Sequence, residues 1–438
     1  CGVLDVTNPN NVLDSALAAP TSATNQSIGA VAATVRALAS VWGPYGTATD
    51  ELLFTGSQDF FGQLDRGNVS DPANQFVGQA YERLAQARWL GDNAIRNLRA
   101  FDQANQLANR ADLATSYLHA ALAYVTAADM YDDFVVGADR EKAAQSVGEA
   151  NMAALYDTAI VYLDRGLTIA TAVNNVELRR QSLALRARAR HAKQVWRLLK
   201  PARRPPSNPL VDDAGATADA QAALTAIGAG DWSWTVTPSL QGTGSPNVGG
   251  DLNQRREFRI SCAYAAPACE PIGSIRRNTV LTENGQPVVA LRDPVTQQPD
   301  VALRGAIARA IGASPAQLLP MTVTSAREMH LIVAEGALAR GDAAAAREAI
   351  NRARALAGQP AWDGTGVTGL DLLRHSRRTH LFLMGRRLAD MYRFGERDPE
   401  WQVGSTAQRS TGCFFSVPEI ERLASAAQGI TIPAPGCR

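Results

Sequence analysis

Apolar and polar positions recur with a helical period over most of the first half of the chain. Between residues 111 and 134, apolar and aromatic side chains repeat at spacings of three and four, which lines one face of a helix. Residues 151–170 and 176–199 show a similar pattern, with short polar breaks between the stretches. Helices joined by short breaks pack as antiparallel neighbours. The pattern therefore predicts helical hairpins from Asn25 to Lys200, where "KPARRPPSNP" ends the last helix because proline lacks an amide donor.

The pattern changes between about Val211 and Pro320. Glycine, proline, asparagine and threonine cluster there, and "TVLTENGQPVVALRD" predicts a β-hairpin around Asn284 and Gly285. Long irregular segments are uncommon in a compact chain unless they have a function. We therefore expect this middle region to contribute to function.

Helical periodicity resumes at Thr324. The stretches "SAREMHLIVAEGALAR" and "AAAAREAINRARALAG" are joined by Gly341 and Asp342, and Gly358 stands where a left-handed helix C-cap is expected. This is a helical hairpin of the tetratricopeptide type, although no strict repeat of about 34 residues is present. The predicted fold class is mostly α, with such hairpins flanking a loop-rich, partly β middle region.

Composition and charge narrow the functional classes. Of the 438 residues, 46% are hydrophobic and 19% are charged, which is ordinary for a globular protein. The formal net charge of +1 provides no long-range field that would attract nucleic acid. The basic stretch from Arg179 to Arg204 is therefore expected to form a solvated or partner-facing surface. No apolar run approaches the roughly 18 residues that a membrane span requires.

The five cysteines indicate an exported protein. Cys1 opens the stretch "CGVLDVTNPNN", as it would after cleavage of a bacterial signal peptide at a lipobox, and we expect acyl chains on it; the alternative is a chain trimmed arbitrarily at a cysteine. The other four form two close pairs, Cys262 with Cys269 and Cys413 with Cys437, and nearness alone predicts two disulfides. Because no C-x-x-C motif and no suitably spaced histidine is present, a zinc site is not expected.

Several stretches, in order from end to end, resemble the SusD/RagB family. Near the N-terminus these are "LDVTNPNN", "TDELLF", "QLDRG" and "AYVTAADMYDDF". In the last third, "REMHLIVAEGALARGDAAAAREAINRARALAG" is similar to the helix pair of the family, and "FFSVPEIERLAS" resembles its closing segment. The stretch "RRTHLFLMGRRLADMYRFG" matches the family pattern at Arg377, Leu381, Gly385, Arg387, Asp390, Arg393 and Gly395.

Three positions depart from that pattern. His380 and Met384 stand where the family has glutamates, and Met391 replaces a leucine. Such positions serve packing and ion pairs between helices, so the departures leave the fold assignment intact. They indicate a divergent branch and point to no particular nutrient.

The resemblance implies a lipoprotein of the bacterial outer membrane that faces the outside of the cell, anchored through lipid on Cys1. It would bind a glycan or a peptide and deliver it to a SusC-like TonB-dependent β-barrel transporter. The implied activity is capture without catalysis, cofactor, metal ion or nucleic acid. The expected organisation is a single SusD-like domain, residues 1–438, divided into a tether (1–24), N-terminal helical repeats (25–200), a loop-rich region (201–320), C-terminal helices (321–400) and a tail (401–438).

Aromatic residues form only 6% of the chain, so their positions guide the search for a ligand site. Flat rings with an apolar body suit stacking on sugar faces. In "VWGPYG" and "SQDFFGQLDRG" we expect rings and polar groups in loops, and in "GDWSWTVT" two rings on one face of a strand. The loop rings could instead fill the core, and for the strand pair sheet packing is favoured over a ligand role. The candidate ligand-binding residues are Trp42, Tyr45, Phe60, Phe61, Asp65, Arg66, Trp232 and Trp234.

Two other functional classes remain open. A helical-repeat scaffold, or a surface protein that assembles with itself, would show the same stacked helix pairs but would use a concave helical surface. An enzyme such as a glycosidase requires two carboxylates across a cleft. The sequence offers no such pair and no nucleophile–base arrangement, so we expect no enzyme.

Overall fold

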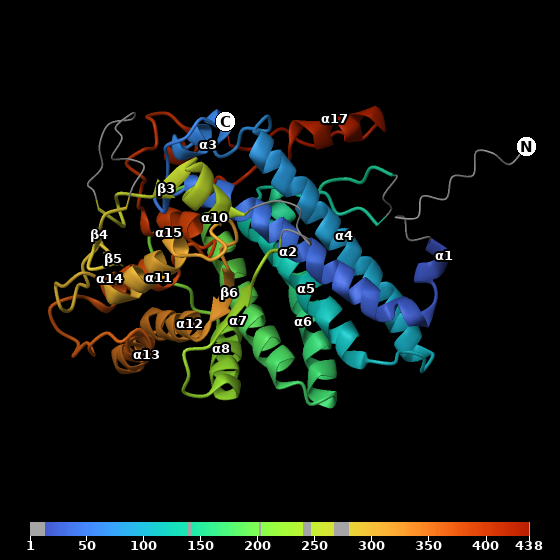
Figure 1. Cartoon of the computed structure of the whole chain (residues 1–438), viewed down its shortest axis with the longest axis horizontal. Coiled ribbons are helices and arrows are strands. Elements are labelled where there is room, and N and C mark those ends of the chain that lie inside the picture. Colours follow the sequence, from blue (N-terminus) through green and yellow to red (C-terminus); the bar gives the residue numbers. More distant parts are fainter. Residues whose placement is uncertain (1–13, 139–141, 201–202, 240–246, 267–279, 438) are drawn as a thin grey trace, which may run out of the picture.

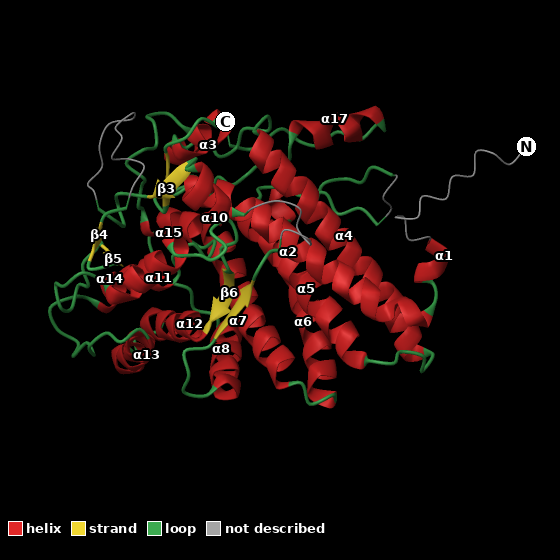
Figure 2. Cartoon of the chain, in the orientation of Figure 1, coloured by secondary structure: helices red, strands yellow, loops and turns green. Residues whose placement is uncertain are grey.

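The fold is described from a computed structural model that covers residues 14–138, 142–200, 203–239, 247–266 and 280–437. Long helices lie side by side in one half of the molecule, and shorter helices fill the other half (Figure 1). The strand pair formed by Ser233–Val236 and Met321–Ser325 lies where the two halves meet, whereas the other short strands lie in the half that holds the shorter helices (Figure 2). The predicted class, mostly α with a partly β middle region, is confirmed.

The N-terminal half is a row of helices in which each packs on the next. Asparagine side chains cap three of them, because Asn74, Asn109 and Asn175 accept the free amides at the helix starts. The helices are α1 (Asp14–Leu17), α2 (Ala23–Thr47), α3 (Asp59–Asp65), α4 (Gln75–Gln103), α5 (Arg110–Met130), α6 (Ala153–Ala172), α7 (Val176–Leu199) and α8 (Ala214–Ile227), with 3-10 turns at Pro20–Ser22 and Glu149–Asn151.

The three helices predicted from periodicity are present as α5, α6 and α7. In addition, α8 lies in the region expected to be rich in loops. Its alanine-rich sequence favours a helix, and Asp213 caps its first turn by accepting the amide of Ala216 at 2.6 Å. Since α8 packs against both α7 and Ala326–Ala339, the first helix of the predicted C-terminal hairpin, it links the two halves.

The C-terminal half contains the predicted helical hairpin. Gly341 and Gly358 adopt φ of +76° and +72°, a left-handed conformation that glycine tolerates best. The helical elements after α8 are α10 (Val248–Gly250), the π-helix η3 (Asp251–Arg255), α11 (Val301–Ile311), α12 (Ala326–Ala339), α13 (Ala343–Leu356), α14 (Gly369–His380), α15 (Arg387–Phe394), α16 (Thr406–Arg409) and α17 (Glu419–Ala427). The hairpin consists of α12 and α13.

Short antiparallel strand pairs connect distant parts of the chain. Leu52 of β1 lies opposite Ile260 of β3, and Trp234 of β2 lies opposite Thr324 of β6. The hairpin predicted around Asn284 is confirmed by the pairing of β4 with β5. The strands are β1 (Leu52–Phe54), β2 (Ser233–Val236), β3 (Phe258–Ile260), β4 (Thr282–Glu283), β5 (Gln286–Pro287) and β6 (Met321–Ser325).

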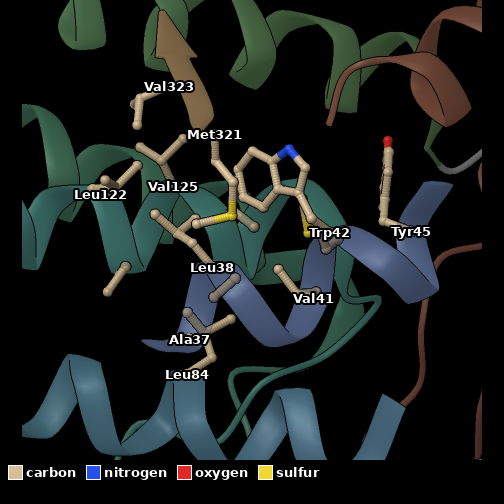
Figure 3. Close-up of a cluster of buried hydrophobic side chains, with 14 of the residues drawn as sticks. Ala37, Leu38, Val41, Trp42, Tyr45, Leu84, Leu122, Val125, Met321 and Val323 are labelled. Carbon is tan, nitrogen blue, oxygen red and sulfur yellow. The ribbon is translucent and has the colours of Figure 1, made fainter. Parts of the chain in front are cut away.

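Helix α2 runs through the centre of the main core (Figure 3). Its Leu38 and Val41 pack among Leu84 of α4, Leu122 of α5 and Val323 of β6, all of them buried. Burying one such side chain contributes roughly 1.5–3 kcal/mol. The core therefore ties the N-terminal helices to the strand that precedes the C-terminal hairpin.

One of the two predicted disulfides is confirmed. Cys413 and Cys437 are bonded, with their Cα atoms 5.8 Å apart. Cys269 and Cys1 lie outside the described residues, so the pairing of Cys262 with Cys269 and the lipid on Cys1 stay predictions. Among the helices that the structure describes, none combines the length and apolar composition of a membrane span.

Candidate functional site

Trp42 and Tyr45 lie inside α2 and are buried, which corrects the expectation that they stand in a turn. Gly43 and Pro44 do not end the helix there, because the side chains around them are fixed by tertiary contacts. The indole Nε1 of Trp42 donates to the carbonyl of Leu383 at 2.6 Å. At 3% and 2% exposure, the rings of Trp42 and Tyr45 have no surface to offer a ligand in this conformation.

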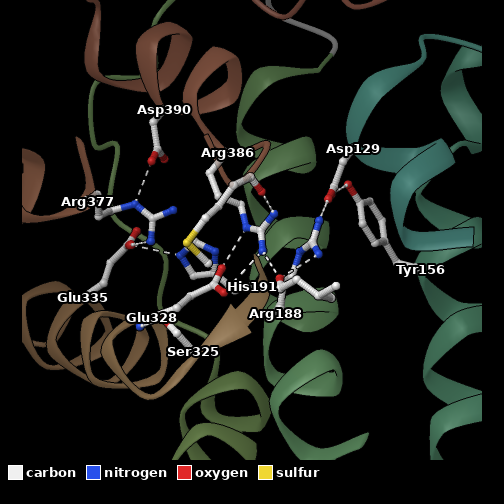
Figure 4. A network of polar contacts seen from close by, with 12 residues as sticks. Asp129, Tyr156, Arg188, His191, Ser325, Glu328, Glu335, Arg377, Arg386 and Asp390 are labelled. Carbon is white, nitrogen blue, oxygen red and sulfur yellow. Dashed lines mark hydrogen bonds and ion pairs between the residues drawn. The ribbon is translucent and has the colours of Figure 1, made fainter. Parts of the chain in front are cut away.

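A buried network of charged groups crosses the molecule beside these rings (Figure 4). On one side, Asp129 of α5 accepts the hydroxyl of Tyr156 at 2.7 Å and forms an ion pair with Arg188 of α7. On the other, Glu328 of α12 binds the guanidinium of Arg386 at 2.7 Å. The network thus joins α5, α6 and α7 to the C-terminal helices.

Glu335 of α12 is the centre of a second part of the network. It lies 2.9 Å from His191 of α7, forms an ion pair with Arg393 of α15 and lies 3.7 Å from Arg377 of α14. Burial opposes its charge, but Arg393 and His191 outweigh burial and leave the pKa of Glu335 well below its usual range. Asp390 completes this part by binding Arg377 at 2.9 Å.

The buried network is not a ligand site. The cavity inside it measures about 40 Å³, far below the roughly 300–1,000 Å³ of small-molecule pockets. A sugar ring or a peptide side chain does not fit there. The network is therefore structural, and it explains why the matching arginines of the family-like motif lie inside the fold.

The basic helix α7 takes part in this pairing, which corrects the expectation of a solvated or partner-facing basic surface. Its Arg186 contacts Asp164 of α6 and Asp219 of α8, each at 2.5 Å. Arg188 is wholly inside the protein. Arg190 and Lys193 of α7 are likewise paired with acidic residues of neighbouring helices, and the sequence alone does not reveal these pairings.

Asp50 and Glu51 connect the loop after α2 to the C-terminal helices. Asp50 binds Arg387 at 2.6 Å and Arg378 at 2.9 Å, and these cations hold its pKa below the usual range despite burial. The Oε1 atom of Glu51 accepts the amide of Leu383 at 2.7 Å. Burial raises the pKa of Glu51 to about 8.

Phe60 and Phe61 lie in the short helix α3, which corrects the expectation that they stand in a loop. Phe61 is buried, stacks on Phe76 of α4 with ring centres 4.0 Å apart, and meets the ring of Phe258 edge-on at 5.3 Å. Phe60 and Phe76 are only partly buried, with ring centres 6.3 Å apart. The accessible rings of this cluster are therefore Phe60 and Phe76, of which only Phe60 was predicted.

The two predicted polar partners of these rings, Asp65 and Arg66, lie in different environments. Arg66 binds Asp59 at 2.9 Å in a largely exposed ion pair, which contributes little to stability. Asp65 is buried at 3% exposure and lies beneath the surface. Arg66 alone remains close to solvent.

A groove with a volume of about 180 Å³ opens beside the stacked phenylalanines. Its walls come from α2, from α4 and from the segment α10–η3. We call it the α2–α4 groove; its aromatic and polar lining includes Ser40, Phe61, Phe76, Gln79, Arg83, Asn247, Asp251 and Arg255. Arg255 binds Asp251 at 2.6 Å, while burial raises the pKa of Asp251 to about 6 against the effect of Arg255. The groove combines ring carbon, amide, hydroxyl and charged groups.

Trp232 and Trp234 lie away from the α2–α4 groove. Trp234 is buried in β2, with its ring edge-on to His119 at 5.7 Å. Trp232 directly precedes β2, is partly buried and donates from Nε1 to Glu177 of α7 at 3.2 Å. Among the described residues that line the α2–α4 groove, neither tryptophan is present.

The groove residues of α4 were not among the residues predicted from the sequence. Phe76, Gln79 and Arg83 are spaced by three and four, so one helix face presents all of them to the groove. The spacing of these three residues is visible in the sequence, but no sequence feature shows that this face of the helix stays accessible to solvent. A larger hollow of about 810 Å³ between α1, α2 and α4 was also missed; Asn25 and Trp89 contribute to its lining.

The comparisons with known proteins identify the fold. No family model and no curated protein sequence matches the chain. Among solved structures, a SusD superfamily protein from Parabacteroides distasonis ATCC 8503 shares 13% identity over 95% of this chain and 98% of its own, with a TM-score of 0.58. A SusD superfamily protein from Bacteroides thetaiotaomicron VPI-5482 shares 12% identity over 94% and 97%, with a TM-score of 0.56.

A third structure is the surface glycan-binding protein A from Bacteroides uniformis. It shares 12% identity over 85% of this chain and 88% of its own, with a TM-score of 0.53. The likeness extends over nearly the whole length in each case. The chain therefore has a SusD-like fold.

Proposed function

We propose that this chain, which has the SusD-like fold, is a cell-surface protein that binds a glycan and passes it to a TonB-dependent outer-membrane transporter. The observation that carries the proposal is the fold likeness over nearly the full chain to a surface glycan-binding protein and other SusD superfamily members. The role is binding, without catalysis or a cofactor. A glycan is favoured over a peptide because the named neighbour is a glycan-binding protein.

The α2–α4 groove is the proposed binding site. Phe76 lines the groove with a partly exposed ring, and the partly exposed ring of Phe60 lies edge-on to it with ring centres 6.3 Å apart; sugar faces pack on such apolar rings. Gln79 and Ser40 supply amide and hydroxyl groups, which both donate and accept hydrogen bonds and so suit sugar hydroxyls. The small volume admits one sugar unit, and a longer glycan would extend from the groove over the surface.

A glycan panel tests this assignment. Phe60→Ala removes a partly exposed ring, and we expect it to weaken binding about tenfold, equivalent to roughly 1.4 kcal/mol. Trp89→Ala, at the larger hollow, is the matched control and should leave affinity unchanged. The opposite result, with Trp89 essential and Phe60 neutral, would move the site to the hollow between α1, α2 and α4. A protein that binds no glycan at all would contradict the proposed function.

The proposal also includes anchoring of the protein through lipid on Cys1 and delivery of the glycan to the transporter. Both are supported by the resemblance of the sequence to SusD/RagB lipoproteins. One acyl chain gives only marginal membrane binding, so stable anchoring needs several chains on Cys1. In its native host, Cys1→Ser should release the protein from the membrane fraction. The wild-type protein should co-purify with a large β-barrel; purification without such a partner would count against delivery to a transporter.

A scaffold role has one observation in its favour. The helix α17 turns an apolar stripe toward solvent, with Ile420 and Leu423 exposed at 75% and 63%. A surface of this kind is typical of contacts with another protein. If the protein binds no glycan yet forms stable complexes that Leu423→Glu disrupts, the scaffold role replaces the proposed one.

A further inference from the structure

The α2–α4 groove carries an excess of positive charge. Arg83 of α4 and Arg255 of η3 line it directly. Arg36 of α2 lies one helical turn before the lining residue Ser40, on the same side of the helix, and is exposed. Two guanidinium groups thus line the groove, and the Arg36 side chain starts one helical turn away from it.

Only one of these charges has an acidic partner inside the groove. Arg255 is matched by Asp251 at 2.6 Å. In the part of the chain that the structure describes, the side chains of Arg36 and Arg83 form no ion pair and no hydrogen bond with a protein group. The segment 240–246, which precedes the lining residue Asn247 and lies outside the described residues, contains no charged residue in its sequence.

The electrostatic environment of Arg83 is unfavourable for a cation. Burial lowers the pKa of Arg83, and the neighbouring Arg36 lowers it further, while exposed Glu82 acts in the opposite direction. An arginine side chain remains protonated under such conditions. The protein therefore holds like charges together at a half-buried position, and an anion bound between them would relieve the repulsion.

The other groups of the groove indicate what kind of anion fits. Phe76 lies seven positions before Arg83 on the same face of α4, and Gln79 lies between them. A ring, an amide and a guanidinium follow one another along one wall. This order matches a sugar ring with hydroxyl groups and one acidic substituent, whereas a free inorganic anion would make no use of the ring.

We infer that the α2–α4 groove selects an acidic sugar, one that bears a carboxylate or a sulfate group, with Arg83 and Arg36 binding the anion and Phe76 packing on the sugar ring. The inference rests on the proposed glycan binding and adds the ligand class. Guanidinium groups bind carboxylate and sulfate oxygens through paired, charge-assisted hydrogen bonds. Because the site is open to water, binding should weaken as salt rises.

Matched polysaccharide pairs test the inference on the full chain. Isothermal titration calorimetry would compare polygalacturonate with its fully methyl-esterified form, and dextran sulfate with dextran. Each pair differs in the acidic group alone, so the two pairs distinguish a carboxylate from a sulfate. We expect at least one acidic member to bind about tenfold or more tightly than its neutral partner, as one lost charge-assisted contact of about 1.4 kcal/mol implies.

Single-arginine variants test whether the preference for acidic polysaccharides arises in the α2–α4 groove. Arg83→Gln and Arg36→Gln should each reduce affinity for the acidic member about tenfold and reduce affinity for the neutral member far less. Arg99→Gln removes an exposed positive charge from the same helix outside the groove and serves as the control for non-specific attraction. Circular dichroism would confirm that each variant is folded.

The outcomes separate the inference from the proposed function. Equal affinity for acidic and neutral members, or an equal loss in Arg83→Gln and Arg99→Gln, would overturn the acidic preference. If neutral glycans still bind and Phe60→Ala weakens them, the proposed function stands without this inference. If no polysaccharide binds, the proposed function fails, and the inference fails with it.

Discussion

Replacing Glu51 with glutamine should stabilise the folded chain at neutral pH. The carboxyl is buried, and burial, together with the nearby Asp50, raises its pKa from 4.5 to about 8 even though Oε1 accepts the amide of Leu383 at 2.7 Å. The fold therefore favours the neutral form of this group. Glutamine has nearly the same shape, keeps an oxygen for the Leu383 amide and never becomes charged.

The magnitude follows from the linkage between protonation and folding. The pKa of the folded state lies above that of the unfolded state, so the contribution of Glu51 to stability is fully present below about pH 4.5 and is lost as the pH rises to about 8. Each pH unit in this interval lowers the free energy of unfolding by about 1.4 kcal/mol. By about pH 7 the wild-type chain has lost roughly 3 kcal/mol that Glu51→Gln retains.

Urea unfolding followed by circular dichroism, at several pH values from about 5 to 8.5, measures this difference. The stability of Glu51→Gln minus that of wild type should be small at about pH 5, grow through pH 7 and become constant above about pH 8. Glu82→Gln, at an exposed position of α4, is the control and should follow the wild-type curve. Parallel curves for Glu51→Gln and wild type would refute the reasoning.

Three further predictions concern stability. Phe61→Ala should lower the free energy of unfolding by about 3–5 kcal/mol because its ring is buried in the stack, whereas Phe60→Ala should cost far less; equal thermal shifts in the two variants would contradict the placement of Phe61 in the core. Cys437→Ser removes the disulfide between two residues that are 24 positions apart, and chain entropy predicts a free energy of unfolding about 3.5 kcal/mol below that of the oxidised wild type. Denaturant unfolding should show this difference, and the difference should vanish when the wild type is reduced. Arg393→Met leaves Glu335 buried without its strongest partner and should lower stability by about 3–5 kcal/mol; an unchanged urea midpoint would show that the pair is not buried as described.

The parts of the fold that the sequence predicted are those set by local signals. Helix α7 begins at Val176 and ends at Leu199 as expected, because an asparagine cap and a lysine–proline stretch bound a strongly periodic segment. The hairpin of α12 and α13 was predicted from the break at Gly341 and Asp342 and from Gly358, where a left-handed C-cap was expected; both glycines adopt a left-handed conformation. The turn between β4 and β5 was likewise predicted from local residues, Asn284 and Gly285.

The candidate site was only partly predictable. Gly43 and Pro44 indicated a turn on local grounds, yet the hydrogen bond from Trp42 to Leu383 and the burial of Tyr45 hold that stretch in a helix. Local propensity is a weak prior that tertiary packing overrides. Of the predicted rings, Phe61 lines the groove and Phe60 lies edge-on to the lining residue Phe76, but no pattern within the sequence distinguished the buried ring from the accessible one.

The remaining groove residues could not be inferred because they come from distant segments. Arg36, Arg83 and Arg255 belong to different elements, and the packing of α2 against α4 and α10 brings Arg83 and Arg255 into one groove, with Arg36 one helical turn away. The sequence likewise does not predict whether a given arginine has an acidic partner, because such partners come from distant segments. Arg188 and Arg83 look alike in the sequence, yet the first is paired with Asp129 and the second is not.

The ion pair between Asp50 and Arg387 has a consequence for how the chain matures. The two residues are 337 positions apart, so a ribosome releases the carboxylate long before its guanidinium partner exists. Without Arg387 and Arg378, burial of the charged Asp50 side chain would be unfavourable, so the closed packing around Asp50 depends on the presence of α14 and α15.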